Sequence, residues 1–175
     1  MPCMMHAKWR GIAQTRIATP LGPMTALATD AGLAGLWFDA QAHHPGPLQA
    51  PIDPNHPHLR AAQRWLAAYW AAEGGTAIQA IESVPLDLRG TPFQRAVWTA
   101  LQALPAGATS TYAAMAQAAG SPAAVRAAGA AIGRNPVSLI VPCHRVLGSG
   151  GSLTGYAGGL ERKHALLAHE GAIAA

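Results

Sequence analysis

The chain has 175 residues, of which 50% are hydrophobic and 11% are charged, so it can form a packed core and general disorder is excluded. No apolar run approaches the ~18 residues of a membrane-spanning helix, and residues 1–10 lack the apolar segment of a secretory signal. The net charge is +4, and residues 1–89 carry six basic and six acidic side chains, so all of the excess lies in residues 90–175. A basic half attracts polyanions, of which nucleic acid is the commonest.

The two cysteines, Cys3 and Cys143, lie far apart in the chain, and no C-x-x-C pair is present. We therefore expect no disulfide framework, no thiolate zinc site and a reduced, cytoplasmic setting. The pairs Cys3 with His6 and His43 with His44 offer too few ligands for a metal site, so we interpret them as surface residues. The sequence predicts neither a metal nor an organic cofactor.

The first half predicts a small antiparallel sheet followed by a helix. Short strand-like runs at residues 16–19, 24–29 and 33–38 are separated by turn residues. The next segment, 40–57, is rich in Pro, His and Gln without periodicity and predicts a surface loop. Residues 58–73 then predict a helix that buries one apolar face.

A domain boundary is expected near the middle of the chain. Residues 78–88 predict an extended segment, and Pro85 within it favours a sheet edge or a linker. Composition changes after Arg89 and Gly90. We therefore expect an N-terminal domain of residues 1–89 and a C-terminal domain of residues 90–175.

Three helices are expected next. Thr91 as N-cap and Pro92 at the first position begin a helix with regularly spaced apolar residues. A short helix from Ser110 or Thr111 ends at Gly120, and another begins at once at Ser121. The last two form a helix-turn-helix pattern, although an ordinary helical hairpin would show the same spacing.

The unusual feature of the second half is a cysteine next to a histidine. Residues 138–141 predict a short buried strand that Pro142 ends, because proline has no N–H to donate. Cys143 would then lie directly after the end of a strand, which is a common place for catalytic groups. His144 can take the thiol proton and Arg145 adds a positive field, which both favour the thiolate. Neighbouring side chains of an extended chain point to opposite sides, so we expect a water between thiol and imidazole. The alternative is a buried structural cysteine.

The end of the chain predicts a glycine-rich loop at residues 155–159 and a helix at 160–170. Glu170 lies at the C-terminal end of that helix, where the helix dipole disfavours a carboxylate. We therefore expect Glu170 to have a partner elsewhere, with His144 as the first candidate and Lys163 or solvent as the alternatives.

Several motifs in this order resemble the O6-alkylguanine-DNA alkyltransferases: the Tyr112 helix start, the Arg126 helix, Asn135-Pro136, Pro142-Cys143-His144-Arg145-Val146 and Gly155-Tyr156-Ala157-Gly158-Gly159. The resemblance runs from residue 88 to residue 171 and is weaker before that. It implies an α/β N-terminal domain of ribonuclease-H-like shape, with a small antiparallel sheet and a helix. It also implies a mainly α-helical, winged-helix-like C-terminal domain whose helix-turn-helix enters the minor groove.

The resemblance implies repair of double-stranded DNA by irreversible transfer of the alkyl group of O6-alkylguanine to Cys143, once per molecule and without a cofactor. His144 would draw the thiol proton through a water, and Glu170 would orient His144. Asn135 would tie the recognition helix to the reactive segment. O4-methylthymine is left open as a further substrate.

The same resemblance implies how DNA is held. The damaged base would be flipped out of the stack, and Arg126 would fill the space that it leaves. Tyr112 would contact a backbone phosphate and the flipped base, and Ala124 and Arg134 complete the expected DNA-binding residues. The protein is expected to be a monomer, and cooperative binding to DNA is left open.

The expected base pocket consists of Tyr112, Val146, Tyr156 and Ala157. The backbone carbonyls of Cys143 and Val146 would accept from the guanine amine. Tyr156 would form a wall, and the Ala157 N–H would reach the guanine oxygen.

Three other functions are considered. A non-catalytic lesion binder related to this family would lack the acceptor cysteine, which this chain has. A cysteine hydrolase would need oxyanion donors of the Asn or Gln type near Cys143. A helix-turn-helix regulator would bind a specific operator and would not need Cys143 at all.

Overall fold

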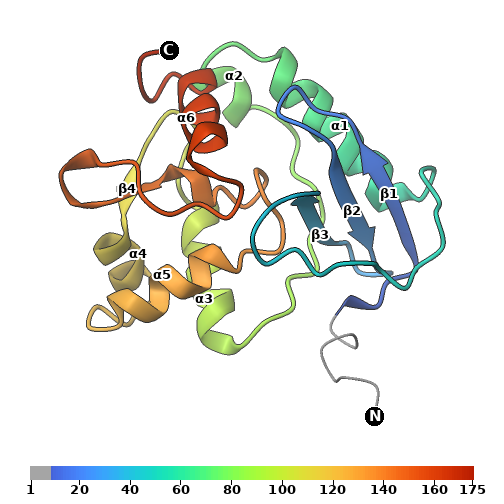
Figure 1. The fold of residues 1–175 in the computed structure, drawn as a ribbon, viewed down its shortest axis with the longest axis horizontal. Coiled ribbons are helices and arrows are strands. Elements are labelled where there is room, and N and C mark those ends of the chain that lie inside the picture. The colour runs from blue at the N-terminus through green and yellow to red at the C-terminus, as the bar shows by residue number, and fades with distance from the viewer. Residues whose placement is uncertain (1–8) are drawn as a thin grey trace.

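Three strands near the start of the chain form an antiparallel sheet of order β1-β2-β3 in the computed structural model, which describes residues 9–175 (Figure 1). The strands are β1 (Ala13–Ile17), β2 (Met24–Ala28) and β3 (Leu33–Phe38). All three predicted strands are confirmed, but the first lies earlier than expected because the Gly22 N–H bonds to the Thr19 carbonyl and makes a turn there.

All six residues of β3 are buried, and its outer edge is also covered. The Leu36 N–H donates to the Pro136 carbonyl at 2.8 Å, and the Ser138 N–H donates to the Leu36 carbonyl at 2.9 Å. A segment from the second half of the chain therefore extends the sheet beside β3.

Helix α1 (Pro57–Ala71) packs its buried face on this sheet and confirms the predicted helix. The expected extended segment at 78–88 is wrong at its start, because Gly74, with φ of 80°, begins a second helix, α2 (Gly75–Gln79). Its later part is confirmed at Leu86, which forms a parallel bridge with Leu33.

The second half contains α3 (Pro92–Gln102), α4 (Tyr112–Ala118), α5 (Val125–Gly133) and α6 (Leu160–His169). Short strands β4 (Ser110–Thr111) and β5 (Val146–Leu147) pair in parallel and bring the start of α4 beside the segment that follows Cys143. The predicted helix starts at Thr91 and Thr111 are confirmed, since both side chains accept capping hydrogen bonds. Helix α5 begins later than expected because the Ala124 N–H closes a turn onto the Ser121 carbonyl.

The strand predicted at residues 138–141 is wrong. Leu139 has φ of 70°, and the Val141 N–H donates to the Val137 carbonyl, so the chain makes a compact turn there. Only Val137 pairs with the sheet, as a single bridge to Leu36. Cys143 starts a 3₁₀ helix (Cys143–Arg145), not the end of a strand.

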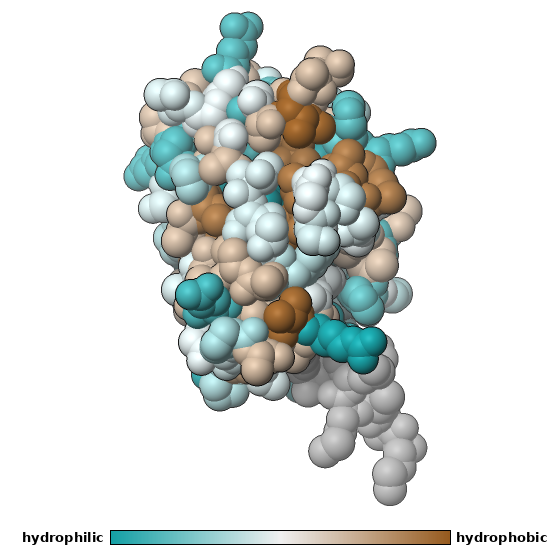
Figure 2. All heavy atoms as spheres, turned by 90° about the vertical axis from the view of Figure 1, so that its left-hand side faces the viewer, coloured by the Kyte–Doolittle hydropathy of each residue, from teal (hydrophilic) through white to brown (hydrophobic). Residues whose placement is uncertain are grey.

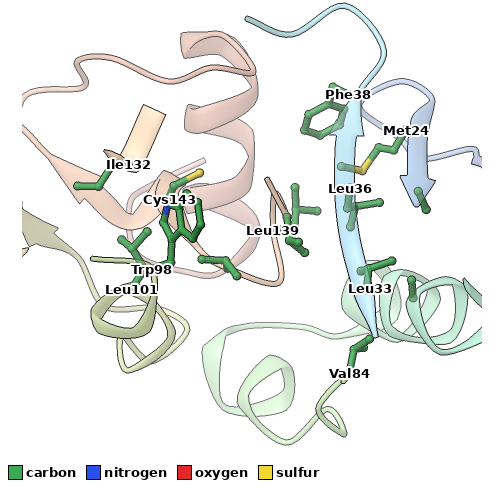
Figure 3. Close-up of a cluster of buried hydrophobic side chains, with 14 of the residues drawn as sticks. Met24, Leu33, Leu36, Phe38, Val84, Trp98, Leu101, Ile132, Leu139 and Cys143 are labelled. Atoms are coloured by element: carbon green, nitrogen blue, oxygen red, sulfur yellow. The ribbon is translucent and has the colours of Figure 1, made fainter. Parts of the chain in front are cut away.

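One hydrophobic core runs through both halves of the chain. Figure 3 shows Leu139 between the Trp98, Leu101 and Cys143 side chains and those of Leu36 and Phe38 on β3. The Trp98 indole N–H also donates to the Ala131 carbonyl of α5 at 2.8 Å. The division of the chain at residues 89 and 90 stays a prediction.

The capping box of α3 gives a direct test of the helix start at Thr91. The Thr91 hydroxyl accepts from the Gln94 N–H, and the Gln94 side chain accepts from the Thr91 N–H. Thr91→Ala should lower the free energy of unfolding by about 1 kcal/mol, because the Gln94 N–H loses its acceptor. Urea unfolding measures this difference. Thr91→Ser is the control and should stay close to the parent, and an equal loss in both variants would contradict the capping role.

Candidate functional site

A cavity of about 250 Å³ opens beside Cys143. Helix α5 contributes Gly129, Ile132 and Gly133 to its wall. Cys143 itself is part of the wall, and the remaining wall residues come from three other segments: Ala42, His43, Tyr112, Gly155, Tyr156 and Ala157. Figure 2 shows the face that carries α4 and α5, where side chains of intermediate hydropathy predominate over strongly hydrophilic ones.

The Cys143 side chain is held as a thiol at rest. The residue is only 5% exposed. Burial raises the pKa of the Cys143 thiol, while a hydrogen bond from the Asn135 side chain and the charge of Lys163 act in the opposite direction. A base must therefore take the proton before the sulfur can act as a nucleophile.

His144 is the base that the geometry offers. Its Nε2 lies 2.7 Å from Glu170 Oε1, and both side chains are fully buried. Burial lowers the pKa of His144 and outweighs the opposite effect of Glu170, so the imidazole is neutral. An ionised carboxylate only accepts, so Nε2 carries the hydrogen and Nδ1 keeps its lone pair. Within the described part of the chain, Nδ1 is buried and has no hydrogen-bond partner.

Glu170 is ionised although it is buried. Burial by itself raises the pKa of a carboxyl group, but hydrogen bonds and charge from His144 and Arg145 outweigh it and hold the pKa of Glu170 well below its usual range. Arg145 donates from Nε to Oε2 at 2.8 Å and from Nη2 to Oε1 at 2.9 Å. The expected pairing of Glu170 with His144 is confirmed, and Lys163 is not its partner.

Two further residues in this network were not assigned to it from the sequence. The Tyr69 hydroxyl on α1 donates to Glu170 Oε1 at 3.0 Å. Arg145 was expected to act on the thiol, whereas its guanidinium bonds to Glu170 and to the Leu104 carbonyl. The spacing of Tyr69 on its helix indicated only a core position.

Lys163 supplies the positive charge near the sulfur. It is fully buried on α6, and its ammonium donates to the carbonyls of Val146, Thr154 and Gly155 at 2.5, 2.8 and 3.1 Å. Burial lowers the pKa of Lys163 to about 8, and the nearby Cys143 acts against this shift. Lys163 therefore also fixes the loop that forms one wall of the cavity.

Asn135 joins the end of α5 to the compact turn at residues 137–141, which leads into Cys143 and is called the reactive turn below. Its Nδ2 donates to the Val141 carbonyl at 2.7 Å, and its Oδ1 accepts from the Val137 N–H at 3.0 Å. These bonds hold the turn that leads into Cys143.

The predicted pocket residues Tyr112, Tyr156 and Ala157 all line the cavity, whereas Val146 is fully buried and does not. The Tyr112 hydroxyl donates to the Thr154 carbonyl at 2.9 Å. The Tyr156 ring packs beside Gly158, where a Cβ atom would lie 2.6 Å from the ring, so this position requires glycine.

The predicted DNA-binding residues Ala124, Arg126 and Arg134 lie on or next to α5. Both arginines are exposed, and neither lines the cavity. They lie at the two ends of the helix whose Gly129 and Gly133 form part of the cavity wall.

Among residues 9–175, no three His, Cys, Asp or Glu side chains are grouped so that they could hold a metal. His44 Nδ1 accepts from the Gly46 N–H, and Cys3 and His6 lie outside the described residues. Across the same range, the helices are too short or too polar to span a bilayer.

Comparison with known proteins agrees with this geometry. Residues 92–172 match the family model "6-O-methylguanine DNA methyltransferase, DNA binding domain". The methylated-DNA–protein-cysteine methyltransferase of Mycolicibacterium paratuberculosis is 42% identical over 154 residues, which cover 88% of this chain and 89% of that protein. The Salmonella typhimurium protein of the same name is 53% identical over 106 residues, which cover 61% of this chain and 60% of that protein.

Solved structures show the same likeness. The Mycobacterium tuberculosis OGT in complex with DNA has a TM-score of 0.80 and 39% identity, covering 91% of this chain and 93% of that one. The fold and the site thus define a protein with a cysteine in the wall of a cavity, beside a helix made mainly of alanine and glycine. The chain belongs to the family of methylated-DNA–protein-cysteine methyltransferases.

Replacing Glu170 by glutamine tests the charge in the network. Glu170→Gln leaves the Arg145 guanidinium buried without its counter-charge, so we expect a loss of about 3–5 kcal/mol in the free energy of unfolding near neutral pH. Because the folded-state pKa lies below the unfolded value of about 4.3, the carboxylate contribution is complete above that pH and is lost as the pH falls. The difference between parent and variant should therefore shrink in acid.

Urea unfolding at several pH values measures both effects. Glu82→Gln, at an exposed position, is the control. A Glu170→Gln effect that is as small as the control effect, or that does not change with pH, would contradict an ionised Glu170.

Proposed function

We propose that this protein repairs double-stranded DNA by moving the alkyl group of O6-alkylguanine to the sulfur of Cys143. The observation that supports it most strongly is the position of Cys143 in the wall of a cavity, backed by the His144–Glu170 pair. A neutral imidazole with a free lone pair is suited to take a thiol proton.

The reaction is a direct substitution at carbon. The Cys143 proton passes through a water to His144 Nδ1, and the imidazolium formed is stabilised by the Glu170 carboxylate at Nε2. The thiolate attacks the alkyl carbon, so an S–C bond forms while the C–O6 bond breaks. The leaving guanine takes up one proton, which balances the proton given up by the thiol, and becomes ordinary guanine.

The cavity accepts the base only after it leaves the duplex, so the proposal includes base flipping from the minor groove. Helix α5 is the recognition element, with Arg126 filling the space that the base leaves. Ala124 allows close approach to the groove, and Arg134 contacts the DNA backbone. Tyr112, at the cavity wall, contacts a phosphate and the flipped base.

Inside the cavity, Tyr156 forms the wall beside the purine and the Ala157 N–H donates to the guanine oxygen. The Ala157 N–H has no other hydrogen-bond partner among residues 9–175, which supports this role. The Cys143 and Val146 carbonyls are proposed to accept from the guanine amine. In the structure these carbonyls also accept from the Val146 N–H and the Lys163 ammonium, respectively.

The product is a thioether, which is a stable group, and the chemistry calls for no cofactor. We therefore propose one turnover per molecule. The proposal also includes a monomeric, cytoplasmic protein with a ribonuclease-H-like N-terminal part and a winged-helix-like C-terminal part. Transfer from O4-methylthymine stays a question for the same assay.

Mass spectrometry after reaction tests the transfer. With duplex DNA containing O6-methylguanine in excess, the intact protein should gain one methyl group, located on Cys143, and limiting protein should repair one equivalent. Cys143→Ser should gain none because a serine hydroxyl is a much weaker nucleophile than a thiolate at neutral pH. Cys3→Ser is the matched control and should react like the parent.

Two results would contradict the proposal. Binding to the lesion without any adduct on Cys143 would indicate a non-catalytic lesion binder. Repair of many equivalents by limiting protein would exclude a single turnover.

A further inference from the structure

One part of the cavity wall has no role in the proposed reaction. Residues 42 and 43 come from the loop after β3, in the half of the chain that carries no net charge. The lining residues differ in exposure, since Cys143 and Ile132 are buried whereas Ala42, His43 and Gly155 are exposed. The exposed residues therefore form the mouth of the cavity, and the sulfur lies at its inner end.

The loop is fixed to the site at two points. The Ala42 N–H donates to the Ala157 carbonyl at 2.8 Å. The Gln41 Oε1 accepts from the Phe38 N–H at 2.9 Å and from the Ser138 hydroxyl of the reactive turn at 3.3 Å. These bonds join the loop to both the glycine-rich wall and the turn before Cys143.

His43 has an unusual backbone conformation at this mouth. Its φ of 59° lies in the left-handed region, which residues other than glycine rarely adopt. Such conformations persist where the surrounding structure enforces them, and they occur often at binding sites. The neighbouring His44 accepts a hydrogen bond from the Gly46 N–H, whereas the His43 side chain has no hydrogen-bond partner within residues 9–175.

A base that reaches Cys143 must leave its own sugar and phosphate at the mouth, where His43 lies. Imidazole N–H groups are suitable donors to phosphate oxygens, and phosphate contacts fix the position of DNA on a protein. A contact here would hold the nucleotide from a segment of the N-terminal half, in addition to the contacts proposed for α5.

We propose that His43 contacts the sugar–phosphate backbone of the extruded nucleotide, so that the DNA interface extends onto the N-terminal half of the chain. This inference rests on the proposed alkyl transfer from a flipped base. It adds a DNA-positioning residue that neither the charge distribution nor the helix-turn-helix pattern indicates.

A pair of isosteric variants tests the contact. His43→Glu and His43→Gln place side chains of the same shape at the same left-handed backbone position and differ only in one negative charge. Their ratio therefore cancels the loss of the imidazole and the change of shape, whereas a nearby phosphate repels only the glutamate; a remaining difference in folding would change the rates on duplex and on free base alike. Single-turnover rates of Cys143 alkylation are measured for both variants with O6-methylguanine duplex, at subsaturating protein and at low and high salt.

With duplex DNA at low salt, His43→Glu should react about three- to tenfold more slowly than His43→Gln, and high salt should reduce this ratio. With O6-methylguanine as the free base, which has no phosphate, the ratio should be close to one. The same pair at His164, an exposed residue of α6 outside the cavity wall, is the control and should give a smaller ratio on duplex.

Equal rates of the two His43 variants on duplex would overturn the inference, as would the same ratio on duplex and free base. A parent protein that alkylates Cys143 with neither substrate would instead contradict the proposed function itself.

Discussion

The buried carboxylate of Glu170 controls the protonation state of the reactive pair, Cys143 and His144. Four hydrogen bonds converge on it, from Tyr69, His144 and two nitrogens of Arg145. Burying a charge costs far more than a hydrogen bond returns unless an opposite charge and good donors accompany it. Arg145 supplies that charge, so His144 can remain neutral while still donating to the carboxylate. The result is an imidazole whose Nδ1 is available as a base next to a protonated thiol.

This arrangement depends on both halves of the chain. The region that matches the family model starts at residue 92, yet Tyr69 on α1 donates to Glu170 and Leu36 on β3 holds the segment that leads into the reactive turn. The loop after β3 also bonds to Ala157 and forms part of the cavity mouth. The N-terminal half therefore acts as the support on which the reactive turn is built. We expect the cavity to lose its shape if this half is removed.

The sequence predicted those parts of the fold and site that local chemistry determines. Helix starts followed from capping residues, and the partner of Glu170 followed from its unfavourable place at a helix end. The prediction of a strand at residues 138–141 was wrong because an apolar run is equally compatible with a strand and with a buried turn. The structure has the turn, with Leu139 in a left-handed conformation. Tyr69 and Lys163 were not assigned to the site because their partners are distant in sequence or are backbone carbonyls. No local pattern shows that a lysine is buried.

In this structure His144 is neutral at physiological pH, with its hydrogen on Nε2 and a lone pair on Nδ1. Nitrogen-15 NMR of the histidine-labelled, unreacted protein tests it most directly, with His144→Gln used to assign the signals. We expect an Nδ1 shift typical of an unprotonated ring nitrogen and an Nε2 shift typical of a protonated one. Two protonated nitrogens, or a hydrogen on Nδ1 in place of Nε2, would contradict it.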